Sequence, residues 1–386
     1  MSDERNSKRL RIFVSAGETS GDLHAAGLIR AIRKTRPDAE FAALGGPQME
    51  SAGARLLHNM LGQFAVIGLT DALKIVPAIR RLRDDTLSFL DSWKPDVAVL
   101  VDYPGFHIHM ARCLKERGIP VFYYICPQVW AWGPWRIRKI ARRIDKALVV
   151  FPFERNLYEC AGIPVEYVGH PLGDVFASRR LDADFIEKGP LAAAKLLISL
   201  LPGSRRKEIE AGFPIKAAAA GIIKSSRPEA TFAVPVTTDE HAALVRRIAA
   251  EKGLDCEVFV GKTYEVMSMS RFALATSGTA TLELAHFGVP MVVLYRTNLL
   301  GLALKKLLIT TEHISLVNIV AGRQIVPELV YARDRARTIA ELALRILDDP
   351  TRLEETRREV LAVGASIDRP GASARAAEAI LKQLKG

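Results

Sequence analysis

The sequence is poor in cysteine and contains no long hydrophobic run. Its four cysteines (Cys113, Cys126, Cys160 and Cys256) are widely spaced and include no C-x-x-C pair, so we expect reduced thiols in a reducing compartment. No stretch of about 18 apolar residues occurs, so we expect no helix that spans a membrane. Residues 1–11 are polar and charged, unlike a secretory signal. These absences predict a cytoplasmic protein that can still touch a membrane surface.

Several motifs of nucleotide and cofactor chemistry are also missing. The sequence has no Walker A loop, no G-x-G-x-x-G fingerprint and no G-x-S-x-G nucleophile elbow. The histidines His107 and His109 are close in sequence, but no cysteine or carboxylate cluster completes a metal site with them. We therefore expect no metal and no other cofactor.

The composition is that of a globular protein with an excess of positive charge. Hydrophobic residues make up 49% and charged residues 25%, which excludes a disordered chain, a collagen-like fibre and a coiled-coil rod. The 54 Lys and Arg residues against 43 Asp and Glu residues give a net charge of +11. Such a field favours a phosphorylated substrate, an acidic membrane surface or a nucleic acid, and an ordinary basic surface is the alternative. No recognised nucleic-acid motif occurs, so we expect no nucleic-acid partner.

Short apolar runs alternate with amphipathic stretches, and the pattern repeats in the second half of the chain. Near-continuous apolar strands separated by helices are typical of a parallel sheet covered on both faces. We therefore predict two Rossmann-like, doubly wound α/β lobes that face each other across a cleft. The predicted strands are Leu10–Ser15, Glu40–Leu44, Val97–Val101, Val121–Ile125, Ala147–Phe151, Val165–Val168, Lys195–Leu201, Thr231–Val236, Cys256–Val260, Phe272–Ala275 and Val289–Leu294.

The predicted lobes comprise residues 1–172 and 173–362 and join near His170-Pro171-Leu172-Gly173. The stretch 363–386 is predicted to be helical. This helix is expected to pack either on the first lobe or on a partner subunit, so a homodimer is one of the two possibilities.

The first predicted strand leads into a turn rich in small residues. Gly17 and Gly21 let the backbone turn sharply and approach a ligand, and Glu18 and Ser20 add polar side chains. Ser20 or Asp22 is expected to cap the helix that follows. A tight turn without a ligand is the alternative.

A carboxylate, Asp102, stands at the carboxyl end of the third predicted strand, followed by Pro104 and Gly105. There it can accept a proton from a substrate hydroxyl, as general-base catalysis requires. It can equally cap the next helix, and this segment alone does not decide between the two.

Apolar and basic residues occur together in three places, and each predicts contact with an amphiphile or a membrane interface. The three stretches are Trp130 and Trp132 with the arginines after them, Val76 and Ile79 with Arg80, Arg81 and Arg83, and residues 298–309. Helices or tryptophans packed in a protein core have the same pattern, so that alternative is retained.

The second lobe has two strand-to-helix turns suited to an anion. Gly203, Ser204 and Arg205 offer backbone N–H groups and a guanidinium. The second turn, Ser277-Gly278-Thr279, opens another helix, and Glu283 one turn later can hydrogen-bond ribose hydroxyls. We therefore predict a nucleotide diphosphate site in this lobe.

Taken together, these segments resemble the lipid-A-disaccharide synthase family, whose members are glycosyltransferases of the GT-B architecture. The resemblance runs from Phe13 to about Val330. The blocks that carry it are the Ala16–Asp22 loop, Gly45-Gly46-Pro47, Asp102-Tyr103-Pro104, Pro127–Trp132, Phe151-Pro152-Phe153-Glu154, Gly169-His170-Pro171, Leu201–Arg205, Ser277–Glu283, Ser315-Leu316-Val317-Asn318 and Ala321-Gly322-Arg323.

The resemblance implies an inverting, metal-independent transfer between two amphiphilic substrates. UDP-2,3-diacylglucosamine would react with 2,3-diacylglucosamine 1-phosphate (lipid X) to give the β-1,6-linked disaccharide 1-phosphate and UDP. It also implies a protein bound peripherally to the inner face of the cytoplasmic membrane, on anionic phospholipid.

The resemblance assigns roles to individual residues as well. Asp102 matches the family's base and Arg205 its essential arginine. The donor-site positions match Gly203, Ser204, Ser277, Gly278, Thr279, Glu283 and Asn318, and the first-lobe loop matches Gly17, Glu18, Ser20 and Gly21.

One departure and two alternatives accompany this interpretation. Gly105 stands where many relatives carry an acidic residue, so any role of that carboxylate is missing here or supplied elsewhere. Another UDP-N-acetylglucosamine enzyme of the same fold, either an epimerase or the peptidoglycan glycosyltransferase, is the first alternative. A non-enzymatic polyanion-binding protein is the more distant one.

Overall fold

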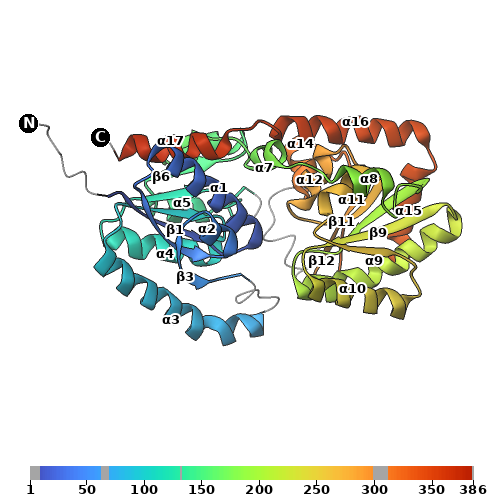
Figure 1. Cartoon of the computed structure of the whole chain (residues 1–386), viewed down its shortest axis with the longest axis horizontal. Coiled ribbons are helices and arrows are strands. Elements are labelled where there is room, and N and C mark those ends of the chain that lie inside the picture. The colour runs from blue at the N-terminus through green and yellow to red at the C-terminus, as the bar shows by residue number, and fades with distance from the viewer. Residues whose placement is uncertain (1–8, 62–68, 131–132, 299–311, 385–386) are drawn as a thin grey trace, which may run out of the picture. The chain divides into compact units, whose positions relative to one another are not determined.

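The computed structural model describes residues 9–61, 69–130, 133–298 and 312–384. The chain divides into two compact units, which are coloured along the chain in Figure 1. Unit 1 is Met1–Ala177 with Arg369–Gly386, and unit 2 is Ser178–Asp368.

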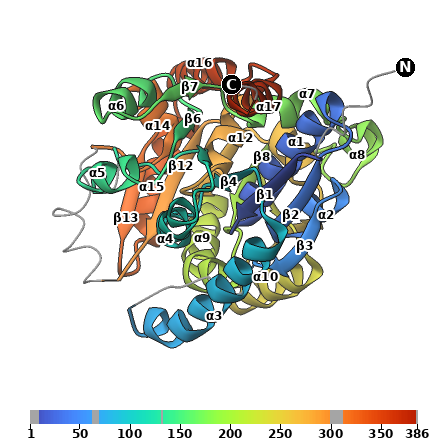
Figure 2. The same cartoon turned by 90° about the vertical axis from the view of Figure 1, so that its left-hand side faces the viewer.

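Unit 1 is built on a seven-stranded parallel sheet with the order β3-β2-β1-β4-β5-β6-β7. The first four of these strands are seen side by side in Figure 2. The strands are β1 (Arg11–Ala16), β2 (Glu40–Gly45), β3 (Arg55–Asn59), β4 (Val97–Val101), β5 (Val121–Tyr124), β6 (Lys146–Val149) and β7 (Val165–Tyr167). All five residues of β4 are buried, because helices cover both faces of the sheet centre.

The helices of unit 1 alternate with these strands. They are α1 (Thr19–Thr35), α2 (Pro47–Ser51), α3 (Leu69–Trp93), α4 (Pro104–Glu116), α5 (Arg136–Ala141), α6 (Glu154–Cys160), α7 (Leu172–Ser178) and the C-terminal α17 (Ala372–Gln383). Helix α17 packs against α1, where a Cβ on Gly27 would lie 3.0 Å from Ser373 Oγ.

The single helix expected over residues 363–386 is two helices in the structure. Helix α16 (Pro350–Ile367) belongs to unit 2, and α17 belongs to unit 1. Pro370 and Gly371, whose φ is 93°, separate them. The Asp174 carboxylate then accepts hydrogen bonds from the first backbone N–H groups of α17, including that of Ser373 at 2.7 Å.

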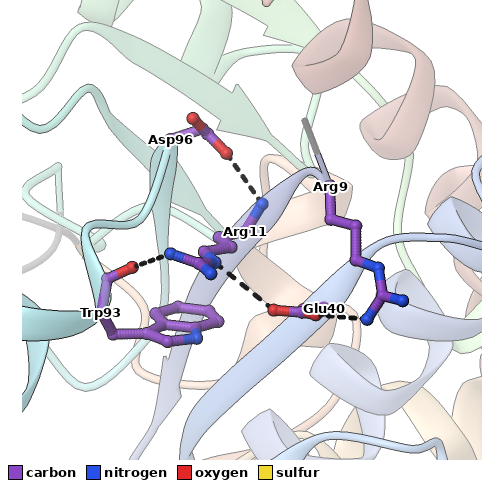
Figure 3. A network of polar contacts seen from close by, with 5 residues as sticks. All are labelled: Arg9, Arg11, Glu40, Trp93 and Asp96. Atoms are coloured by element: carbon purple, nitrogen blue, oxygen red, sulfur yellow. Dashed lines mark hydrogen bonds and ion pairs between the residues drawn. The ribbon is translucent and has the colours of Figure 1, made fainter. Parts of the chain in front are cut away.

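The amino ends of the unit 1 strands are tied by one polar network, drawn in Figure 3. The Arg11 backbone N–H donates to Asp96 Oδ2 at 2.8 Å, and its guanidinium donates to the Trp93 carbonyl at 2.8 Å. Glu40 accepts from Arg11 and from Arg9. Polar contacts therefore occupy the amino-end side of the sheet, and the carboxyl ends of the strands lie on the opposite side.

Unit 2 repeats the design with a six-stranded parallel sheet of order β10-β9-β8-β11-β12-β13. Its strands are β8 (Leu196–Leu201), β9 (Ala230–Val236), β10 (Glu257–Val260), β11 (Phe272–Thr276), β12 (Met291–Arg296) and β13 (Glu328–Tyr331). Its helices are α8 (Ala183–Lys188), α9 (Arg206–Ser226), α10 (Asp239–Lys252), α11 (Thr263–Met269), α12 (Ala280–His286), α14 (Leu316–Ala321), α15 (Ala336–Leu347) and α16. The prediction of two doubly wound α/β units is confirmed.

Every predicted strand is present, with ends that differ by at most two residues. Strands β3 and β13 were not predicted from the sequence. Both lie at sheet edges and are only partly buried, so neither carries the continuous apolar run used to recognise the other strands.

Candidate functional site

The topology of each sheet marks where its ligand site lies. In unit 1 the winding reverses between β1 and β4, and in unit 2 it reverses between β8 and β11. Ligands of such sheets bind outside the carboxyl ends of the strands at this switch point. In unit 1 the predicted base and the predicted first-lobe loop follow β4 and β1, and most of the predicted donor-site residues of unit 2 follow β8 and β11. Each set is therefore brought together by the fold of its own unit.

The turn after β4 has an unusual backbone. Asp102 and Tyr103 have φ angles of 50° and 52°, in the left-handed region that is costly for residues other than glycine. The Asp102 carbonyl accepts from the Tyr123 hydroxyl at 2.7 Å and from His107 Nδ1 at 2.5 Å, and its N–H donates to the Tyr124 carbonyl at 3.1 Å. Asp102 itself is half-buried. Such strain, when it is held by neighbours, is a feature of functional sites.

The loop after β1 touches this turn directly. The His107 ring bonds through Nε2 to Ser15 Oγ at 2.7 Å. A Cβ on Gly17 would lie 2.3 Å from the Tyr103 ring, so only glycine fits at that position. Glu18 is the N-cap residue of α1, and Ser20 and Gly21 lie in its first turn. The predicted first-lobe residues and Asp102 thus share one corner of unit 1.

The expected helix cap in this loop is wrong. The Asp22 carboxylate is buried and accepts from the N–H groups of Gly46, Gln48 and Met49 at 2.9–3.2 Å. It therefore caps α2, and helix α1 has no side-chain cap from Glu18.

Trp130 belongs to an aromatic cluster, which we define as Trp130, Phe151 and Phe153. The Trp130 ring lies 5.2 Å from that of Phe153, which stacks on Phe151 at 5.5 Å. Trp130 Nε1 donates to Glu154 Oε1 at 3.1 Å, and burial raises the pKa of Glu154 to about 7. Phe153 is 41% exposed, so the cluster presents an apolar edge to solvent. Trp132 lies outside the described residues.

The basic stretch of α3 is partly exposed. Arg80 and Arg81 are exposed, and Arg83 is half-buried and paired with Asp84 at 2.7 Å. Ile79 packs against the core of unit 1, and Val76 is half-buried. The arginines therefore offer the more accessible part of the predicted membrane contact. Residues 299–311, which cover nearly all of the third apolar-basic stretch, lie outside the described residues.

In unit 2 the turn after β8 is held by a carboxylate of the next helix. Gly203 has a φ of 117°, and Arg205 is the N-cap residue of α9. The Glu208 carboxylate accepts from the Ser204 N–H at 3.1 Å and from Arg205 Nη1 at 3.2 Å. Backbone amide and guanidinium donors therefore converge on one carboxylate in this turn, which is the donor set an anion requires.

The second turn of unit 2 carries the other predicted donor-site residues. Ser277 Oγ donates to the Ile314 carbonyl at 3.1 Å, Gly278 follows it, and Thr279 is the N-cap residue of α12. Glu283 accepts from the Tyr264 hydroxyl at 2.9 Å, and burial raises its pKa.

Asn318, another predicted donor-site residue, hydrogen-bonds to groups within unit 2. It is fully buried, and Nδ2 donates to the Val326 carbonyl at 2.9 Å and to Glu328 Oε1 at 2.6 Å. Its Oδ1 accepts from the N–H groups of Ile325 and Val326. These bonds make Asn318 a support for the loop between α14 and β13, and direct contact with a donor stays a prediction.

A buried lysine that the sequence analysis missed lies beneath both turns of unit 2. Lys216 is 1% exposed, and its Nζ donates to Thr276 Oγ1 at 2.7 Å. The Thr276 hydroxyl donates in turn to the Leu201 carbonyl at 3.1 Å. These two partners end β11 and β8, just before the two turns. Burial lowers the pKa of Lys216 to about 7, against a smaller opposing effect of Glu208.

The described residues contain neither a cluster of metal-binding side chains nor a membrane-spanning helix. Within residues 9–61, 69–130, 133–298 and 312–384, no group of three or more His, Cys, Asp or Glu side chains could hold a metal ion. In the same ranges no helix is long and apolar enough to cross a bilayer.

Comparison with known proteins identifies close sequence relatives. The profile of the lipid-A-disaccharide synthetase family matches residues 12–379. Lipid-A-disaccharide synthase of Geobacter sulfurreducens is 38% identical over 374 residues, covering 97% of both chains. The protein of the same name from Nitrosococcus oceani is 38% identical over 381 residues, covering 97% of this chain and 96% of that one.

Solved structures share the architecture at much lower identity. UDP-GlcNAc 2-epimerase from Neisseria meningitidis, bound to UDP-GlcNAc, superposes with a TM-score of 0.66 at 14% identity, covering 97% of this chain and 100% of that one. A putative UDP-N-acetylglucosamine 2-epimerase from Listeria monocytogenes gives a TM-score of 0.67, also at 14% identity, covering 97% and 96%. These matches show the fold alone.

Proposed function

The chain belongs to the lipid-A-disaccharide synthase family, and from this premise we propose how its two units divide the reaction. The protein is a hexosyltransferase of lipid A biosynthesis with two Rossmann-like units of the GT-B architecture. The family uses a UDP-sugar and a lipid-linked acceptor. The proposed donor is UDP-2,3-diacylglucosamine and the proposed acceptor is lipid X. The products are the β-1,6-linked disaccharide 1-phosphate and UDP, with inversion at the anomeric carbon.

Unit 1 supplies the base in this proposal. Asp102 takes the proton from the acceptor 6-hydroxyl, whose oxygen forms the new bond to the anomeric carbon as the bond to UDP breaks. The strained turn at the carboxyl end of β4 is the observation that supports this assignment, since the backbone of a residue with a carboxylate is held there at the switch point of the sheet. Gly17, Glu18, Ser20 and Gly21 line the same corner and are assigned to the reacting sugars.

Unit 2 binds the donor in this proposal. Arg205 and the amides of Gly203 and Ser204 neutralise the leaving diphosphate, which takes the place of the Glu208 carboxylate. Ser277, Gly278, Thr279 and Glu283 complete the donor site around the second turn, with Asn318 supporting the adjacent loop.

No metal takes part in the proposed reaction, and the assay that tests the function also tests this point. Lipid X and UDP-2,3-diacylglucosamine are incubated with the protein in detergent and EDTA, and products are separated by thin-layer chromatography. We expect a disaccharide phosphate that requires both substrates. A sample that consumes or epimerises UDP-N-acetylglucosamine, and forms no disaccharide, would contradict the lipid assignment.

The epimerase alternative is not favoured. The epimerase structures share 14% identity with this chain, whereas the synthase relatives share 38% over nearly the whole length. The aromatic cluster and the exposed arginines of α3 support an amphiphilic substrate over a soluble one.

Peripheral binding to anionic phospholipid at the inner face of the cytoplasmic membrane is the remaining part of the proposal. Changing Arg80, Arg81 and Arg83 to Ser should weaken sedimentation with anionic vesicles by roughly fivefold for each of the exposed Arg80 and Arg81, because an exposed cation contributes about 1 kcal/mol near such a surface. The loss from Arg83 should be smaller, since Arg83 is half-buried and paired with Asp84. The matched control removes three exposed cations of α10, namely Arg246, Arg247 and Lys252. Equal losses from both triple variants would contradict a membrane face on α3.

A homodimer is retained as a proposal, and light scattering in detergent tests it. A monomer mass at assay concentration would contradict it.

A further inference from the structure

The left-handed turn at Asp102 needs an explanation, because Asp102 and Tyr103 are two consecutive non-glycine residues in a backbone region that is costly for any residue with a Cβ. The turn joins a fully buried strand to helix α4, whose N-cap residue is Tyr103. Without a specific constraint the backbone would relax, and the Asp102 carboxylate would change direction. The contacts around the Asp102 carbonyl oxygen supply that constraint.

Two side-chain donors converge on this oxygen. His107, in the first turns of α4, donates from Nδ1 at 2.5 Å, and Tyr123, on β5, donates its hydroxyl at 2.7 Å. A carbonyl oxygen only accepts hydrogen bonds, so the proton of the neutral His107 ring is on Nδ1. The peptide plane after Asp102 is thereby fixed from two directions.

The other ring nitrogen of His107 reaches strand β1, which leads into the other loop of the site. Nε2 carries no proton in this tautomer, so it accepts from Ser15 Oγ, 2.7 Å away at the end of β1. His107 is fully buried, and burial lowers its pKa to about 4, so the ring is neutral at pH 7. Its hydrogen bonds to the Asp102 carbonyl and to Ser15 then set the tautomer. One neutral side chain therefore connects the end of β1, just before its loop, with the turn after β4.

We propose that His107 is a positioning residue, which sets the direction of the Asp102 carboxylate through the Asp102 carbonyl and aligns it with the loop after β1. This inference rests on the proposed function, in which Asp102 is the base. Tyr123 assists by donating to the same oxygen. Because a misplacement of about 1 Å in a reacting group costs roughly 100-fold in rate, loss of the Nδ1 contact should appear in kcat.

Two amide variants separate the two contacts of His107. In His107→Asn the amide nitrogen takes the place of Nδ1, so the bond to the Asp102 carbonyl can be kept and the bond to Ser15 is lost. In His107→Gln the amide reaches the place of Nε2, so the bond to Ser15 can be kept and the bond to Asp102 is lost. The two variants carry the same amide group and differ by one methylene group. Each variant is therefore the control for the other.

We expect His107→Gln to lower kcat by about tenfold or more and His107→Asn to keep most of it, with the KM of the UDP-sugar changed by less than about threefold in both. A residue with only a structural role would change the melting temperature of the two variants and leave kcat per folded molecule equal. Equal kcat values for the two variants would therefore overturn the inference.

The double variant Asp102→Asn/His107→Gln distinguishes this inference from the proposed function. If His107 acts through Asp102, the double variant should turn over no more slowly than Asp102→Asn alone. Independent, multiplying losses would overturn the positioning role and leave Asp102 as the base. Normal turnover of Asp102→Asn would instead overturn the proposed base. Should both amide variants fail to fold, Tyr123→Phe removes the second donor with little change of shape, and an unchanged kcat there would contradict the account.

Discussion

The two units place their candidate residues at the same point of the same topology, yet they build the turns differently. Among the described residues, the non-glycine positions with positive φ are Lys94, Asp102, Tyr103 and Ile125, all in unit 1. In unit 2 the turn after β8 bends at Gly203 instead. A turn that presents backbone N–H groups to an anion needs no side chain, so glycine suffices. A turn that presents a carboxylate cannot use glycine there, and neighbouring hydrogen bonds must hold the strain.

Each unit also has a buried ionisable side chain beneath its turns, His107 in unit 1 and Lys216 in unit 2, and the two differ in charge. His107 in unit 1 is neutral at pH 7 and acts through geometry. Lys216 in unit 2 lies beneath two turns assigned to a diphosphate, and its pKa is lowered to about 7, so it carries charge part of the time. In unit 1 the buried group therefore orients the turn that carries Asp102, and in unit 2 the buried group adds positive charge beneath the turns assigned to the diphosphate.

The largest expected effect is the loss of kcat in Asp102→Asn, which tests whether Asp102 reacts or only supports the turn. Asp102→Asn should lower kcat at least about 100-fold, because a positioned base contributes that much or more, and should keep the fold. Steady-state kinetics with both lipid substrates and circular dichroism check the two statements. Near-normal turnover would mean that the strained turn serves structure only.

Arg205→Ala should lower kcat/KM by about 100-fold, since it removes a charged donor to the leaving diphosphate. The matched control is Arg206→Ala, because Arg206 is the adjacent residue and forms exposed ion pairs with Glu210 and Glu240. Comparable losses in the two variants would show a general charge effect and not a site in this turn.

Gly17→Ala tests the contact between the two loops of unit 1. The new Cβ would lie 2.3 Å from the Tyr103 ring, so one loop must shift, and kcat should fall by roughly tenfold. Gly105→Ala is the control, since a Cβ there meets nothing within 4 Å. If Gly17→Ala is as active as Gly105→Ala, the packing of the loops does not position the base.

The smallest effect concerns the charge of Lys216. A bound diphosphate favours the ammonium form and raises its pKa, so UDP affinity should fall by roughly fivefold as pH rises from about 7 to 9. Lys216→Met should weaken UDP binding at pH 7 and remove most of this pH dependence, which titration calorimetry measures. An identical pH profile in the variant would contradict the charge effect.

The same variant has a predicted effect on stability. The pKa of Lys216 is about 7 in the folded protein and 10.5 is its ordinary value, so the unfolded chain binds more protons between these pH values. The contribution of Lys216 to the free energy of unfolding therefore rises with pH across that window. Lys216→Met should be the more stable protein at pH 7 and lose that advantage toward pH 10, as urea unfolding would show.

The sequence predicted the parts of this design that depend on local pattern. Buried strands such as Val97–Val101 are continuous apolar runs, and glycine-containing turns follow several of them directly, so most strands and the loops at their carboxyl ends could be inferred. Hydrogen-bond partners that are distant in the sequence could not be inferred. Asp22 was expected to cap its own helix but caps α2, because the cap depends on how β2 and α2 lie beside α1.

The roles of His107 and Lys216 show the same limit. His107 was considered only as a metal ligand, since its bonds to Ser15 and to the Asp102 carbonyl require the folded sheet. Lys216 is a single cation on the apolar side of the long helix α9, and that pattern indicates a buried lysine. Its partner Thr276 lies on β11, 60 residues away in the sequence, so the contact could not be predicted.

A titration of UDP into Asp102→Asn, beside Arg205→Ala and the unmodified protein, tests the division of chemistry between the units most directly. The account predicts that Asp102→Asn binds UDP as the unmodified protein does, within about twofold, although it barely turns over, and that Arg205→Ala loses at least about tenfold in affinity. Weakened UDP binding in Asp102→Asn, or unchanged binding in Arg205→Ala, would contradict it.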